Sequence, residues 1–218
     1  RATSKLRAIG VMALLLVAAV LQPARADSAL DCYGEDWERR IAGCTALIEG
    51  GGLNAVELAQ AYAARALAQS LKGQYGNAVR DYDEAIGLVP DFAVALNNRA
   101  WAFYKWGRGR DGLVDVEKSI ALSPVSAHSY DTRAHIRQEM GQADAALADY
   151  ELSMRYGGQR MIKLYQCGLT ENRLYTGPID GIWTPILSEA LETCTRSTKC
   201  DPLPADEQCR PGMSQLKG

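Results

Sequence analysis

The sequence predicts an all-α protein built from stacked helical hairpins, and three observations support this prediction. Related residues recur every 34 positions through the middle of the chain. Apolar residues before and after these repeats have the spacing of amphipathic helices. The composition, with 47% hydrophobic and 23% charged residues, is ordinary for a folded globular protein. A period of this length is typical of a two-helix unit that stacks on its neighbours.

The first 26 residues have the three-part pattern of a secretory signal peptide. Basic residues precede an apolar stretch from Ala8 to Leu21, and Ala24-Arg25-Ala26 is a small-x-small cleavage signal. The stretch is shorter than the roughly 20 residues of a membrane span. An uncleaved anchor is the alternative, but we expect no stable span after cleavage. The sequence therefore predicts an exported protein, located in the periplasm of a Gram-negative bacterium.

Charge argues against a nucleic-acid partner. The leader contains four basic residues and no acidic one, so cleavage after Ala26 leaves 20 basic and 26 acidic residues. The resulting net charge of −6 is unfavourable for binding a phosphate backbone, which requires a basic surface.

All six cysteines follow the predicted cleavage site, and an even number in an exported protein predicts disulfides. Two precede the repeats and four follow them. This clustering favours the pairs Cys32–Cys44, Cys167–Cys194 and Cys200–Cys209. No CxxC spacing is present, so we predict no zinc site and no other metal.

Three segments of the chain align at the 34-residue period. Each has a large residue, a small residue four positions later, and a glycine seven positions after that. The three sets are Tyr62, Ala66 and Gly73; Leu96, Ala100 and Gly107; and Tyr130, Ala134 and Gly141. Ala78, Gly112 and Ala146 follow in the second helices, and Pro90 and Pro124 close two of the repeats. The third segment runs instead into Gly157-Gly158, a predicted helix stop.

These residues resemble the tetratricopeptide repeat (TPR), a helix–turn–helix family. The resemblance implies a right-handed superhelical stack, and we expect a small disulfide-bonded helical module after it. We expect a signal peptide over 1–26, a cap-helix region over 27–58, three TPR-like repeats over 59–160 and the C-terminal module over 161–218. Within the cap region, Asp36 to Glu49 has the apolar spacing of one helix.

Each repeat also carries an arginine on its first helix and an aspartate 16 residues later. The three pairs are Arg65 and Asp81, Arg99 and Asp115, and Arg133 and Asp149. We favour structural ion pairs that hold each hairpin together, because an acid accompanies every arginine. The alternative is an arginine ladder that binds an anionic ligand.

The TPR resemblance implies that the first helix of each hairpin lines a concave groove, where a protein or peptide partner binds. The residues that the resemblance places there, with a neighbouring asparagine, are Asn97, Asn98, Trp101, Tyr104, Lys105, Asp131 and His135. An extended peptide would be held by backbone hydrogen bonds and by ring packing. The alternative for Trp101 and Tyr104 is packing against neighbouring helices.

Residues 159–196 resemble a small helical peptidoglycan-binding domain. The resemblance rests on Gln166 and Leu169, the loop from Tyr175 to Gly181, Trp183, and Ala190-Leu191. It implies glycan contacts by Tyr175, Asp180 and Trp183. Thr184 departs from the family pattern, and a cysteine-rich tail replaces the family's final helix. A stabilising cap that keeps only the fold is therefore the alternative.

We find no pattern for catalysis. No paired-carboxylate, nucleophile–base or phosphate-binding motif is present, so we predict no enzyme, no catalytic residues and no cofactor. The predicted function is a non-enzymatic scaffold or adaptor that binds a protein or peptide, with a cell-wall-associated protein that binds peptidoglycan as the alternative.

Overall fold

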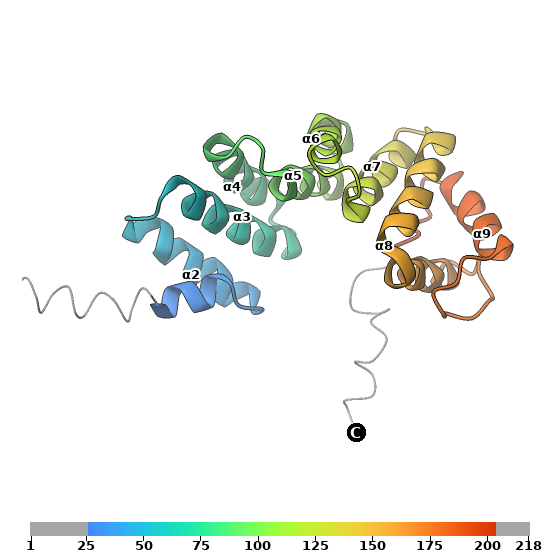
Figure 1. Ribbon diagram of the computed structural model, residues 1–218, viewed down its shortest axis with the longest axis horizontal. Helices are drawn as coiled ribbons and strands as arrows, with labels where there is room; N and C mark the ends of the chain where they lie inside the picture. The colour runs from blue at the N-terminus through green and yellow to red at the C-terminus, as the bar shows by residue number, and fades with distance from the viewer. Residues whose placement is uncertain (1–25, 204–218) are drawn as a thin grey trace, which may run out of the picture. The chain divides into compact units, whose positions relative to one another are not determined.

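The computed structural model describes residues 26–203, and every regular element in this range is an α-helix (Figure 1). The helices are α2 Trp37–Gly50, α3 Ala55–Leu71, α4 Tyr75–Leu88, α5 Ala93–Lys105, α6 Gly109–Leu122, α7 Ala127–Glu139, α8 Ala143–Glu171 and α9 Pro185–Thr195. Residues 26–32 are also helical. Within 26–203, none of the helices is both long and apolar enough to cross a membrane. Apart from Ala26, the predicted signal peptide lies outside the described residues.

The chain divides into two compact units, residues 1–95 and 96–218. In the first unit, local side-chain caps fix where α2 and α3 begin. The Asp36 side chain accepts a hydrogen bond from the Arg39 backbone N–H, and Asn54 and Glu57 form a reciprocal capping box. Cys32 and Cys44 are bonded to each other, as the sequence favoured, and this disulfide is buried. The predicted cap helix is therefore α2, joined covalently to the segment before it.

The three repeat glycines end the first helix of each hairpin. Gly73, Gly107 and Gly141 each have φ of 74°, in the left-handed region that side chains with a Cβ rarely adopt. The residue before each glycine is the last position at which the helical backbone can continue. The common φ explains why glycine recurs at this step of the period.

In the second unit, the third hairpin and the C-terminal module share one buried core. Helix α8 is broken at Gly158, which has φ 59° and ψ −153°, and a second helical segment follows at once. Tyr150 and Met154 precede the break, and they belong to the same buried cluster as Tyr165, Leu187 and Leu191. The module after Gly158 therefore packs directly on the third hairpin.

A close approach between α5 and α6 explains the glycine in the middle repeat. A Cβ built on Gly112 would lie 2.8 Å from the Ala100 Cα and 2.9 Å from its carbonyl oxygen. Both neighbours are backbone atoms, which cannot rotate away. The other two repeats carry Ala78 and Ala146 at this position, and both are fully buried.

We expect Gly112→Ala to destabilise the second unit by up to about 2 kcal/mol. Alanine gains about 1 kcal/mol of helix propensity over glycine, but overpacking against backbone costs about 1–3 kcal/mol. Gly87→Ala is the matched control, because nothing lies within 4 Å of a Cβ at Gly87 in α4, so only the propensity gain applies. Urea unfolding of both variants measures the difference. A stabilised Gly112→Ala protein would contradict the close approach.

Candidate partner-binding surface

The three predicted Arg–Asp pairs form in the structure, and each joins the two helices of one hairpin. Arg65 donates from Nε to Asp81 Oδ2 at 2.7 Å and from Nη2 to Oδ1 at 2.8 Å. The other two pairs repeat this bidentate geometry, with Nε–Oδ2 distances of 2.7 Å for Arg99–Asp115 and 2.8 Å for Arg133–Asp149. The fork of each guanidinium is thus directed at a carboxylate of its own hairpin. This geometry favours the structural interpretation over an anion-binding ladder.

The third pair is the most buried of the three. The Asp149 side chain is only 2% exposed, against 10% for Asp81 and 11% for Asp115. A second arginine, Arg137, donates from Nη1 to Asp149 Oδ2 at 2.8 Å. Two guanidinium groups therefore neutralise this one buried carboxylate.

The predicted groove residues of α5 form a partly exposed aromatic and cationic surface. The rings of Trp101 and Tyr104 lie 5.1 Å apart, and Lys105 Nζ lies 5.6 Å from the Trp101 ring centroid. Asn97 donates to Asn98 Oδ1 at 3.3 Å. The Asn97 Oδ1 atom is buried without a hydrogen-bond partner. We call Asn98, Trp101, Tyr104 and Lys105 the α5 surface, since all four are at least partly exposed.

The predicted groove residues of α7, in contrast, are buried. Asp131 is 4% exposed and His135 is 2% exposed. The Tyr165 hydroxyl donates to Asp131 Oδ1. His135 Nδ1 lies 2.9 Å from the Asp131 carbonyl oxygen, and His135 Nε2 lies 3.0 Å from Asp201 Oδ1. Neither residue is free to contact a partner while these interactions persist, which differs from the open groove that the sequence predicts.

Aromatic rings surround the His135 imidazole. Trp101 and Tyr104 of α5 and Tyr150 of α8 have ring centroids 5.3, 5.3 and 5.1 Å from it. Trp101 and Tyr104 therefore pack against His135 of α7. This is the predicted alternative, in which the two rings pack against neighbouring helices.

Two carboxylates control the charge of His135. Burial by itself lowers the pKa of His135, but Asp131 and Asp201 raise it to about 9. Burial raises the pKa of Asp131, against the opposing effects of His135 and Tyr165. Burial would also raise the pKa of Asp201, but the hydrogen bond from His135 lowers it. At neutral pH the imidazole is thus an imidazolium that pairs with Asp201.

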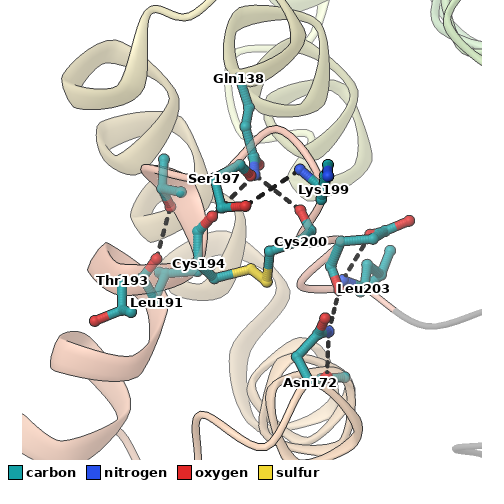
Figure 2. The surroundings of a disulfide bond; sticks show 12 residues. Gln138, Asn172, Leu191, Thr193, Cys194, Ser197, Lys199, Cys200 and Leu203 are labelled. Atoms are coloured by element: carbon teal, nitrogen blue, oxygen red, sulfur yellow. Dashed lines mark hydrogen bonds between the residues drawn. A yellow bond between two sulfur atoms is a disulfide. The ribbon is translucent and has the colours of Figure 1, made fainter.

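Asp201 belongs to a segment that follows α9 and returns to α7. The Gln138 amide nitrogen lies 3.1 Å from the Cys194 carbonyl oxygen, 2.6 Å from that of Ser197 and 2.8 Å from that of Cys200. Figure 2 shows Gln138 pointing into the loop that the disulfide closes. The Tyr150 hydroxyl donates to Gln138 Oε1 at 2.6 Å, which fixes the orientation of the amide. Sequence analysis missed Gln138, although it lies three residues after the predicted groove residue His135 on the same helix.

The disulfides of the C-terminal module differ from the predicted pairs. Cys194 is bonded to Cys200, so the pairs Cys167–Cys194 and Cys200–Cys209 are wrong. The turn after α9 places the two Cα atoms 5.3 Å apart, which is within the range that a disulfide spans. Cys167 is also disulfide-bonded, and Cys209 lies outside the described residues. A separation of six residues is the sequence signal that could have indicated the observed pair.

Gln166 organises the loop that resembles a peptidoglycan-binding motif. Its Nε2 donates to Asp180 Oδ1 at 3.0 Å and to the Ile182 carbonyl at 3.1 Å, and its Oε1 accepts from the Gly181 backbone N–H at 2.8 Å. Tyr175 is only 2% exposed, so its ring belongs to the core and offers no face to a glycan.

The other two predicted glycan-contact residues are partly exposed and take part in local hydrogen bonds. The Trp183 indole N–H donates to Ser188 Oγ at 2.7 Å. The Ile182 backbone N–H donates to Asp180 Oδ1 at 2.9 Å, which is the main cause of a lowered pKa for Asp180. These contacts hold the loop against its own helices.

No cluster of three or more histidine, cysteine, aspartate or glutamate side chains within residues 26–203 is arranged to hold a metal ion. Asp131, His135 and Asp201 interact with one another and with Tyr165. Their polar atoms are used for mutual hydrogen bonding.

These hairpins define a helical-repeat protein, and comparison with known families agrees. Residues 59–92 match the tetratricopeptide repeat family model. This match covers the first of the three predicted repeats, which consists of α3 and α4 and contains the Arg65–Asp81 pair. The repeat class inferred from the 34-residue period is thus shown for this hairpin.

Several curated proteins are similar to part of the chain. Hsp70-Hsp90 organizing protein of Triticum aestivum is 31% identical over 83 residues, which cover 38% of this chain and 14% of that protein. Hsp70-Hsp90 organizing protein 3 of Arabidopsis thaliana is 34% identical over 83 residues, covering 38% and 15%. Tetratricopeptide repeat protein 36 of Bos taurus is 29% identical over 106 residues, covering 47% and 56%. The matched region thus spans about a seventh of the first two relatives.

Among solved structures, that of MamA has a TM-score of 0.49 and 17% sequence identity, and the match covers 56% of this chain and 68% of that chain.

Proposed function

We propose that this protein is a non-enzymatic scaffold or adaptor of the bacterial periplasm that binds a protein or peptide through its TPR-like hairpins. The observation that carries the proposal is the α5 surface. There an indole, a phenol ring and an ammonium group lie side by side on the first helix of a repeat. Tryptophan and tyrosine side chains are enriched among the residues that dominate binding energy.

Two disulfides support the exported location. Cys32–Cys44 and Cys194–Cys200 are both formed, and such bonds persist in oxidising compartments such as the periplasm. The experiment is a fusion of residues 1–40 to a reporter enzyme that folds only with its own disulfides. Reporter activity supports export, and an inactive but expressed reporter argues against it.

Capture of a partner by the α5 surface tests the main proposal. Trp101→Ala combined with Lys105→Ala should lose the proteins that the wild-type chain cross-links in an envelope extract. Trp106→Ala is the matched control, because Trp106 is a 43% exposed indole adjacent to the α5 surface but not part of it. Circular dichroism confirms folding of each variant. Equal capture by both variants would contradict the α5 surface as the binding site.

The alternative function, peptidoglycan binding, rests on the loop between Tyr175 and Trp183 and its resemblance to a known domain. Co-sedimentation of the full chain with purified peptidoglycan tests it directly. We expect any retention to depend on Trp183 and Asp180, because Tyr175 is buried. A chain that remains in the supernatant has no wall-binding activity.

A further inference from the structure

The segment after α9 contacts α7 in the way that a bound peptide contacts a receptor. We call residues 196–203 the strap, and His135 and Gln138 the α7 face. Gln138 binds backbone carbonyls at the start of the strap, and His135 binds the one acidic side chain within it, Asp201. Gln138 thus recognises main-chain groups of the strap (Figure 2), and His135 recognises its side-chain carboxylate.

Charge complementarity accompanies these contacts. The imidazolium of His135 lies 3.0 Å from Asp201 Oδ1, and Lys105 of the α5 surface also lowers the pKa of Asp201. The strap therefore places its carboxylate against a cation of α7, within electrostatic reach of a cation of α5. A second anchor comes from Asn172, whose Nδ2 donates to the Asp201 carbonyl at 2.7 Å.

The strap is attached unevenly along its length, and the Cys194–Cys200 disulfide ties it to the end of α9. Residues 196–199 are exposed. The Gln138 amide has two N–H groups but three carbonyl oxygens within 3.1 Å, so they share its donors. Pro202 is buried and Leu203 packs partly on the core. A segment with few buried apolar contacts opens at a lower free-energy cost than the whole unit.

We propose that the strap is an intramolecular ligand that occupies a peptide-binding site on the α7 face, and that an acidic peptide of similar turn geometry competes with it. This inference rests on the proposed function, because it names the chemistry of the partner that the third hairpin accepts. With the strap in place, a partner contacts only the α5 surface. When the strap leaves, His135 and Gln138 lose their strap partners and join Tyr104 and Lys105 in one larger surface.

A peptide with the sequence of residues 194–203, closed by its own disulfide and labelled with a fluorophore, is the probe. The protein is the full chain, either wild type or carrying Asp201→Ala. The tethered strap competes at an effective concentration in the millimolar range, so the wild-type chain should bind the probe weakly. Asp201→Ala removes the strap's carboxylate but leaves the α7 face unchanged. We expect it to bind the probe at least tenfold more tightly than wild type, by fluorescence anisotropy.

Two controls make the result specific. Lys199 is an exposed strap residue that takes part in none of the contacts with α7 described above. The Lys199→Ala protein should therefore bind the probe like wild type. A probe with asparagine in place of its aspartate should lose the gained affinity. A folded Asp201→Ala protein that binds the probe no better than wild type would overturn the proposal.

Hydrogen exchange of the wild-type chain is a second, independent measurement. The amides of residues 197–201 should exchange faster than those of α9, because the strap opens without unfolding of the unit. Exchange of both segments at the same rate would show that the strap is part of the permanent core, and would also overturn the proposal. Neither assay uses the natural partner. If the probe binds as expected but no partner is captured, the result contradicts the proposed function and leaves the inference about the strap standing.

Discussion

Replacing Asp149 with alanine is expected to lower the free energy of unfolding of the second unit by about 3 kcal/mol. The Asp149 carboxylate is 2% exposed and accepts hydrogen bonds from both Arg133 and Arg137. Removing it leaves two guanidinium groups, only 17% and 23% exposed, without their counter-ion. Loss of one partner of a buried pair is costly because the remaining charge stays desolvated. Urea unfolding followed by tryptophan fluorescence measures the loss, since Trp101, Trp106 and Trp183 all lie in this unit.

Asp115→Ala is the matched comparison in the same unit. Asp115 is 11% exposed and pairs bidentately with Arg99, so we expect a smaller loss of about 1–2 kcal/mol. Asp149→Asn keeps one oxygen acceptor. The free energy of unfolding of this variant should therefore lie between those of Asp149→Ala and wild type. Equal losses for Asp115→Ala and Asp149→Ala would show that burial and the second arginine add nothing.

The features that the sequence predicted correctly are those that the repeat itself determines. Gly73, Gly107 and Gly141 occupy the same left-handed backbone position, because a hairpin of fixed length needs its turn at a fixed place. The Arg–Asp pairs form because residues 16 apart face each other whenever two helices of this length fold back. Such contacts are local, so the period alone is enough to anticipate them.

The features that the sequence did not predict depend on contacts between distant parts of the chain. Gln138 meets Cys200 across 62 residues, and His135 meets Asp201 across 66. No repeat relates these positions, so nothing in the spacing places the strap on α7. The partner of Cys194 was also misassigned, because the predicted pair Cys167–Cys194 joins two elements, whereas the observed pair Cys194–Cys200 closes the single turn after α9.

The local sequence alone also gives the wrong reason for Gly112. A glycine in place of the usual alanine indicates a weak start to α6 if only helix propensity is considered. The structure gives it a packing reason, because α6 approaches the Ala100 backbone too closely for any Cβ. The departure from the repeat pattern at Gly112 is therefore a consequence of tertiary contact.

The stability of the second unit is expected to fall as the pH rises from about 6.5 to 9, because of His135. Its pKa is raised to about 9 in the folded protein, against about 6.5 in an unfolded chain. A group whose pKa is raised by folding contributes stability that is fully present below the unfolded pKa and is lost as the pH passes the folded pKa. The expected loss over this range is on the order of 3 kcal/mol, and urea unfolding at a series of pH values measures it.

Three tyrosines and Asp201 that face the cluster have pKa shifts that act outside this pH range. The electrostatic neighbours of the cluster are Asp131, Asp201, Tyr104, Tyr150, Tyr165, Lys105, Glu139 and His128. Burial raises the pKa of the three tyrosines above its ordinary value of 10, so their ionisation weakens the fold only at still higher pH. The lowered pKa of Asp201 adds stability that is lost only below about pH 4.

His135→Gln is the control, because an amide retains a hydrogen-bond donor for Asp201 but does not titrate. Its stability should vary less with pH between 6.5 and 9 than that of wild type. The imidazole Cε1–H resonance of wild-type His135 gives the folded pKa directly, and Asp201→Asn should move its midpoint to lower pH, because one of the two carboxylates that favour the imidazolium is lost. A wild-type midpoint at or below 6.5 would mean that burial outweighs both carboxylates, and that the strap is attached to a neutral imidazole.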